Sequence, residues 1–184
     1  MRLTAGGRTL TQALTVTRDP RLSATEADLS KQYELARTVQ DERLRVAVAQ
    51  RQADALRKQI AALKGRAAGE QASALSDLSK AIDRSAGPPI LFPGEEFFDT
   101  EEISPTSLRR LGSSLSAFQS AVESADGAPT PDAQAGFAER RKMTSEGLAR
   151  WQGVVVNELP KANGILEAAG LGPLKLDGEE RGRN

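Results

Sequence analysis

Apolar residues recur at alternating intervals of three and four positions between residues 35 and 63. The members of this series are Leu35, Val39, Val46, Ala49, Ala53, Leu56, Ile60 and Leu63. Only Glu42 interrupts it. Such spacing is typical of a helix that packs against a partner helix in a left-handed, coiled-coil-like manner. We therefore predict a long helix that begins at a capping box formed by Ser23 and Glu26 and ends near Lys64.

Three further segments repeat the helical spacing. The helix predicted over about 70–85 carries Leu75, Leu78 and Ile82. The next should begin at Ser104 and Pro105, a cap followed by a proline, and its stripe consists of Leu108, Leu111, Leu115, Phe118, Val122 and Ala125. The last should begin at Thr130 and Pro131, and its stripe consists of Phe137, Thr144, Leu148, Trp151, Val155, Leu159, Ala162, Leu166 and Ala169. Because Pro160 cannot donate to the carbonyl of Val156, we expect a kink there.

The N-terminal segment has a different period. In residues 9–17, Leu10, Leu14 and Val16 share one parity, and the other parity is mostly threonine. This alternation predicts a half-buried strand, with Arg2 to Thr4 as its hairpin partner across the turn at residues 5–7. A lone two-stranded hairpin is marginally stable in water. We expect the hairpin to pack against the helices, against another copy of the chain or against a further sheet.

Together these elements predict a mainly α fold: an antiparallel bundle of about four helices, two of them long, with a short N-terminal β-hairpin. The predicted organisation is a hairpin at 1–21, a bundle at 22–176 with a long loop at 86–104, and a disordered tail at 177–184. Short connections at 65–69 and 126–130 pair the first helix with the second and the third with the fourth. Since the second helix is too short to cover the first, the rest of the first must pack on the last helix or on a second chain.

Composition narrows the possible chemistry. The 184 residues include no cysteine and no histidine, so thiol nucleophiles, histidine bases and Cys/His metal sites are excluded. The formal net charge is zero, which argues against a general nucleic-acid binder. No stretch approaches the roughly 20 apolar residues of a membrane span, and the first residues lack the apolar segment of a signal peptide.

One segment is rich in carboxylates. Its acidic residues are Glu95, Glu96, Asp99, Glu101 and Glu102. Carboxylate oxygens could bind Ca²⁺ or serve a carboxylate-based hydrolase, although the spacing differs from that of the regular calcium-binding loop. Alternatively, the loop is solvated and Phe97 and Phe98 cover the end of the bundle, which is the interpretation we favour. A third possibility is that the loop lies against the basic half of the first helix.

That basic half spans residues 43–66. Its cations are Arg43, Arg45, Arg51, Arg57, Lys58, Lys64 and Arg66, against the single acid Asp54. Such a run could bind an anionic membrane surface or nucleic acid, but the stretch has no aromatic residue for base stacking. We expect a solvated face with intramolecular pairing and no nucleic-acid partner. Glu42, on the apolar seam, could be a buried acid or base, or could reach the edge of the seam.

Two stretches resemble a known family. The first is Gly-Arg-Thr-Leu-Thr-Gln-Ala-Leu-Thr-Val-Thr-Arg-Asp-Pro-Arg at 7–21, which leads into a helix with Asp28, Leu29 and Gln32. The second comprises Leu148-Ala-Arg-Trp-Gln, Asn157-Glu-Leu-Pro, Asn163 and Ala169-Gly-Leu-Gly-Pro-Leu. They resemble the C-terminal region of large bacterial β-propeller proteins of the BNR/sortilin-like type, often described as glycosyl hydrolases. There the propeller is followed by an immunoglobulin-like sheet domain and a closing helical region.

The resemblance implies that residues 1–21 are the last strands of such a sheet domain and that any hydrolase activity belongs to the propeller. It also implies export to the periplasm or beyond. From the residues and the resemblance together we expect a non-enzymatic interaction or accessory domain without a cofactor, which binds a protein partner or another copy of itself. The residues predicted to make that contact are Leu10, Leu14, Val16, Arg43, Arg51, Arg57 and Lys58.

Overall fold

The computed structural model describes residues 1–89 and 103–176. Its elements, in chain order, are β1 (Arg2–Ala5), β2 (Arg8–Thr11), α1 (Glu26–Leu63), α2 (Glu70–Ala86), α3 (Leu108–Glu123), α4 (Pro131–Gly153), the π-helical segment η2 (Val154–Glu158) and α5 (Leu159–Ala168). The mainly α class, the helical bundle and the short N-terminal hairpin are confirmed. The acidic segment at 95–102 and the tail at 177–184 lie outside the described residues.

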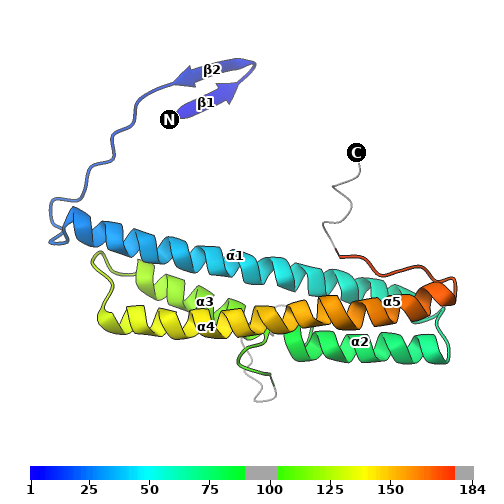
Figure 1. The fold of residues 1–184 in the computed structure, drawn as a ribbon. Helices are drawn as coiled ribbons and strands as arrows, with labels where there is room; N and C mark the ends of the chain where they lie inside the picture. The colour runs from blue at the N-terminus through cyan, green and yellow to red at the C-terminus, as the bar shows by residue number, and fades with distance from the viewer. Residues whose placement is uncertain (90–102, 177–184) are drawn as a thin grey trace.

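Helix α1 runs along the whole bundle (Figure 1). Helices α3 and α2 follow one another along it, and α4, η2 and α5 together form a second long rod beside them. The most extensive contacts of α1 are with α3, and it also packs on α2 and α4. The part of α1 that α2 does not reach is therefore covered by α3 and α4 of the same chain.

The predicted seam of α1 is the centre of the core. Its buried residues are Val39, Glu42, Val46, Ala49, Ala53, Leu56 and Ile60, and Leu35 and Leu63 at the two ends are partly buried. Leu75, Leu78 and Ile82 of α2 and Leu108, Leu111 and Leu115 of α3 are buried against this seam and its neighbours. The alternating apolar spacing thus identified the packed face of each of these helices.

Two helix starts differ from the prediction. Helix α1 is capped by Thr25, not Ser23: the Thr25 hydroxyl accepts from the Asp28 N–H at 3.1 Å, and Asp28 Oδ2 accepts from the Thr25 N–H at 3.0 Å. Helix α3 is capped by Ser107, not Ser104. Residues 104–107 form a turn closed by a bond from the Ser107 N–H to the Ser104 carbonyl. In both places two capping sequences overlap, and the structure uses the one nearer the buried stripe.

The last helix is interrupted where the kink was expected, and the interruption is the π-helical segment η2. Its closing bond runs from the Leu159 N–H to the Val154 carbonyl, five residues back. The buried positions Trp151, Val154 and Leu159 are therefore spaced by three and then five. The extra residue of a π-turn keeps α4 and α5 facing the same core. Val154 is the buried residue here, and the predicted Val155 is only partly buried.

The N-terminal strands are shorter and more exposed than predicted. The antiparallel pair joins Leu3 to Leu10 and Thr4 to Thr9, and β2 ends at Thr11, so residues 12–17 are not part of a strand. All of residues 1–18 are exposed, and the hairpin projects away from the helices (Figure 1). The predicted half-buried strand is wrong because no other element of the described chain covers its apolar face.

Candidate functional site

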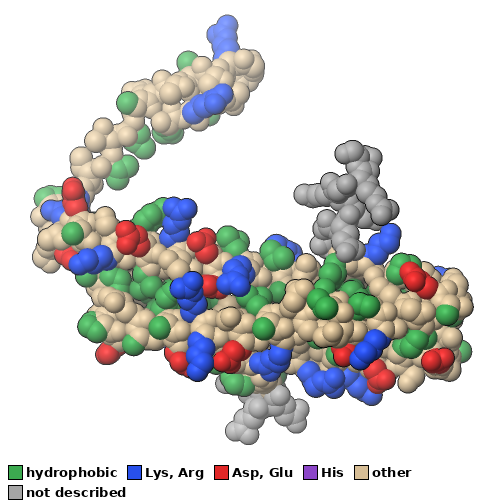
Figure 2. Space-filling model, viewed as in Figure 1, with side chains coloured by type: hydrophobic (Ala, Val, Ile, Leu, Met, Phe, Trp, Pro, Cys, Tyr) green, Lys and Arg blue, Asp and Glu red, His purple; other side chains and the backbone are tan. Residues whose placement is uncertain are grey.

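The first candidate site is the N-terminal arm, defined as residues 1–18. Its large apolar residues are Met1, Leu3, Leu10, Leu14 and Val16, which are between 61% and 86% exposed. Leu3 and Leu10 are opposite each other in the hairpin register, and Leu14 and Val16 share the parity of Leu10. Figure 2 shows hydrophobic side chains along the arm, well separated from the bundle.

The arm joins the bundle at a tight turn. The Arg21 guanidinium contacts the Asp19 carboxylate at 2.6 Å, and this pairing lowers the pKa of Asp19. The Leu22 N–H donates to the Asp19 carbonyl, and Nη1 of Arg18 donates to the Ala24 carbonyl at 2.6 Å. Within the part of the chain that the structure describes, residues 13–17 make no backbone hydrogen bond. Their N–H and C=O groups are therefore available to another strand.

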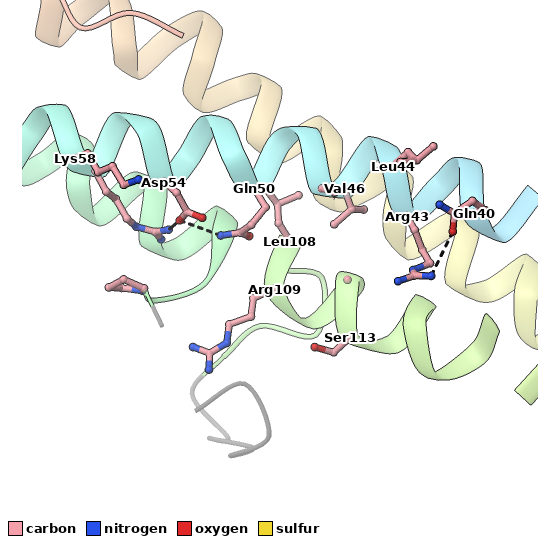
Figure 3. Close-up of a pocket in the computed structure, with 14 residues that line it drawn as sticks. Gln40, Arg43, Leu44, Val46, Gln50, Asp54, Lys58, Leu108, Arg109 and Ser113 are labelled. Carbon is pink, nitrogen blue, oxygen red and sulfur yellow. Dashed lines mark hydrogen bonds and ion pairs between the residues drawn. The ribbon is translucent and has the colours of Figure 1, made fainter. Parts of the chain in front are cut away.

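The second candidate site is a groove of about 660 Å³ between α1 and α3 (Figure 3). Its lining residues are Gln40, Arg43, Leu44, Val46, Ala47, Gln50, Asp54, Arg57, Lys58, Pro89, Leu108, Arg109, Gly112 and Ser113. Of these, four are cationic and one is acidic. We call this surface the cationic groove. The lining residues of α1 lie on successive turns of the helix, along the border between its buried seam and its polar face.

The cations of the groove differ in how they are held. Nη1 and Nη2 of Arg57 lie 2.8 Å from Asp54 and Asp83 respectively. Arg43 donates to Gln119 at 2.6 Å and to Gln40 at 3.3 Å, both of them neutral. Lys58 is exposed and forms no hydrogen bond or ion pair with any described residue. Arg109 donates to the Pro88 carbonyl at 3.4 Å.

The residues that the sequence predicted to contact a partner lie in different parts of the structure. Arg43, Arg57 and Lys58 meet in the groove, whereas Arg51 is exposed and lies outside it. Leu10, Leu14 and Val16 lie on the arm. Sequence reasoning missed Gln50 and Arg109, because only the packing of α3 on α1 places their side chains in one groove.

Glu42 is buried, with its side chain 6% exposed. Its Oε2 lies 2.8 Å from Nη1 of Arg45, and its Oε1 lies 3.4 Å from Nε of Arg141 on α4. Two guanidinium groups thus supply the opposite charge that a buried carboxylate needs. Glu42 does not line the cationic groove or the three smaller pockets described beside it.

Trp151 belongs to the core, as expected, and its indole N–H donates to Gln52 at 3.0 Å.

Comparisons with protein-family models, with curated protein sequences and with solved structures found no match. Among the described residues no helix is long and apolar enough to cross a bilayer, and no three carboxylates lie close enough together to hold a metal ion. The predicted metal candidates Glu95, Glu96, Asp99, Glu101 and Glu102 lie outside those residues.

Proposed function

We propose that this chain is a non-catalytic helical module that mediates protein–protein contact, and that copies of it associate through the N-terminal arm. The observation that carries the proposal is the apolar surface of the arm, where Leu3, Leu10, Leu14 and Val16 are all more than half exposed. Apolar surface on this scale gains stability when another surface removes it from water. Its isolation from the bundle leaves the arm free to reach a second molecule.

The backbone of the arm favours another copy as the occupant. Residues 13–17 lie outside any helix or strand, and they are uncharged and rich in strand-forming residues, so two arms can approach without like-charge repulsion. In an antiparallel pairing that sets Leu14 opposite Val16 of the second copy, two-fold symmetry sets Val16 opposite Leu14 and Thr15 opposite Thr15. This register is self-complementary, as a two-fold interface requires, and it satisfies the unpaired backbone groups.

The resemblance to the C-terminal region of sortilin-like propeller proteins supports an accessory role of this kind. In such an architecture the arm corresponds to the last strands of a sheet domain, a segment that pairs with other strands. The absence of cysteine and histidine from the sequence removes the commonest nucleophiles and bases. Both observations favour a module that holds proteins together over one that carries out a reaction.

The test is the molar mass in solution, measured by light scattering over a range of concentrations. We expect a concentration-dependent dimer. Leu14→Lys should weaken it at least about tenfold, since burying a leucine contributes about 1.5–3 kcal/mol. Ala13→Lys is the matched control: it adds the same charge to the opposite face and should leave the dimer within about threefold of the wild type. A monomer at all concentrations, or equal effects of the two substitutions, would overturn the proposal.

A further inference from the structure

We propose that the cationic groove is a binding site for an acidic, amphipathic peptide segment of a partner protein. The groove lies between α1 and α3 (Figure 3), and its described lining includes no residue of the arm. This inference therefore goes beyond association through the arm and does not depend on it. Three properties of the described lining define the ligand: its excess of positive charge, its apolar floor and its lack of an aromatic side chain.

The described lining residues of the groove carry more positive than negative charge. Asp54, the acid among the described lining residues, is already engaged by Arg57 at 2.8 Å. Arg43 is held by neutral amides, which orient its guanidinium but leave its positive charge uncompensated. Lys58 has no partner among the described residues. Carboxylates spaced along a peptide would pair with these cations, and charge-assisted hydrogen bonds are the strongest polar contacts available.

Gln50 is a neutral residue of the groove lining. Its side-chain Nε2 donates to Asp54 Oδ1 at 3.3 Å, which fixes the orientation of the amide. The opposite atom, Oε1, is buried and has no hydrogen-bond partner among the described residues. Figure 3 shows Gln50 extending from α1 into the space beside α3. Because Oε1 is inaccessible from the groove, a peptide would contact the cations and the apolar lining around Gln50 and not this atom.

The floor of the groove selects for an apolar side chain on the same ligand. We use this name for the lining residues Val46 and Ala47 from α1 and Leu108 and Gly112 from α3. A Cβ atom built on Gly112 would lie 3.8 Å from Val46 Cγ1, so a larger side chain could be accommodated there. Glycine in a helix interior costs roughly 0.5–1 kcal/mol relative to alanine. Here it keeps the space between the two helices open.

These requirements fit a peptide better than a nucleic acid or a membrane. The described lining contains no aromatic side chain on which a base could stack. A lipid bilayer presents a broad surface, whereas the cations here line a groove between two helices and flank an apolar floor. An acidic segment with leucine-like side chains on one face offers carboxylates and an apolar anchor together.

The experiment is fluorescence anisotropy with a labelled synthetic peptide of about four helical turns that carries glutamates and one face of leucines. The full chain should bind it with micromolar affinity at low salt and more weakly at high salt. The same peptide with its leucines replaced by serine should bind at least about tenfold more weakly, because it lacks the anchor. Single-stranded DNA and vesicles of anionic lipid serve as competitors.

Two charge reversals on one helix provide the matched comparison. Lys58→Glu changes a groove cation without removing a bond to any described residue, and should weaken peptide binding about tenfold. Arg51→Glu makes the same charge change at an exposed site outside the groove and should change the affinity for the peptide less than about twofold. Gly112→Leu fills the floor and should abolish binding. Leu14→Lys on the arm should not alter it, which keeps this test separate from that of self-association.

Four outcomes would overturn the proposal. The first is no binding of the peptide at any concentration tested. The second is an equal loss with Lys58→Glu and Arg51→Glu, which would indicate nonspecific charge attraction. The third is stronger, Lys58-dependent binding of DNA or of the vesicles. The fourth is binding only after the acids at positions 95, 96, 99, 101 and 102 are neutralised, because the occupant would then be the chain's own acidic segment.

Discussion

Nη2 of Arg57 in α1 lies 2.8 Å from Oδ1 of Asp83 in α2, 26 positions further along the chain. The same guanidinium group donates to Asp54 on its own helix and to the carbonyl of Gly87, the C-cap of α2. Its side chain is 12% exposed. One largely buried arginine therefore joins the C-terminal end of α2 to the C-terminal part of α1 and satisfies a carbonyl that the helix leaves open.

We predict that Arg57→Met lowers the free energy of unfolding by about 1–2 kcal/mol. Asp54 and Asp83 are 49% and 42% exposed, so water can solvate them when the arginine is lost, which keeps the cost below that of a fully buried pair. Urea unfolding followed by circular dichroism measures the change. The neighbouring exposed cation provides the control: Lys58→Met should stay within about 0.5 kcal/mol of the wild type. Equal effects would contradict the fastening role of Arg57.

Two helical glycines should respond in opposite ways to alanine. A Cβ atom on Gly147 of α4 would overlap Leu111 Cδ1 and lie 2.5 Å from the backbone oxygen of Thr106, so Gly147→Ala should destabilise the fold by about 1–3 kcal/mol. Gly112 of α3 has ordinary van der Waals space, so Gly112→Ala should stabilise it by up to about 1 kcal/mol. The urea midpoints of the two variants should therefore fall on opposite sides of the wild type. A stabilised Gly147→Ala variant would mean that α3 and α4 are not in close contact.

The sequence predicted the helices and their buried faces well, and for a physical reason. Each of α1, α2 and α3 has its buried residues on one face, so the spacing of its apolar residues reports directly on its packing. The η2 segment shows the limit of that approach. Both Val154 and Val155 are apolar, and only the extra residue of the π-turn decides that Val154 is the one facing the core.

The candidate sites were predicted less completely. The apolar alternation of the arm was visible in Leu10, Leu14 and Val16, but alternation implies a covered face and the described chain does not cover it. The cationic groove joins Gln50 and Arg57 to Arg109, residues more than 50 positions apart in the sequence. Their proximity follows from how α3 packs on α1, which no local pattern encodes.

Glu42 interrupts an otherwise apolar seam, and we predict that Glu42→Leu stabilises the fold by about 1 kcal/mol. Arg45 and Arg141 are 57% and 65% exposed, so water solvates them when the carboxylate is lost, and leucine completes the apolar series of α1. Thermal and urea unfolding measure the effect.

Glu42→Gln provides the contrast, because it keeps the shape of the side chain but places a buried neutral amide against two guanidinium groups. This variant should be less stable than the wild type by about 1–2 kcal/mol. If both substitutions destabilised the protein equally, the ion pairs themselves would be stabilising the seam.

The start of α1 predicts a measurable pKa. The Thr25 hydroxyl and the Thr25 backbone N–H both donate to Asp28, and these bonds lower the pKa of that carboxyl. A lowered pKa in the folded state stabilises the fold at pH values above the usual aspartate range, and this contribution is lost as the pH falls through the lowered value. Thr25→Val removes the hydroxyl and keeps the N–H, so the pKa of Asp28 should rise part of the way to its ordinary value. A carbon-13 NMR titration of the carboxyl groups measures the pKa of Asp28. Asp19 is the internal reference, because Arg21 lowers its pKa and the substitution should leave that pKa unchanged. An unchanged pKa of Asp28 in the variant would show that the hydroxyl does not hold the carboxylate in solution, and that the cap of α1 rests on the backbone bond alone.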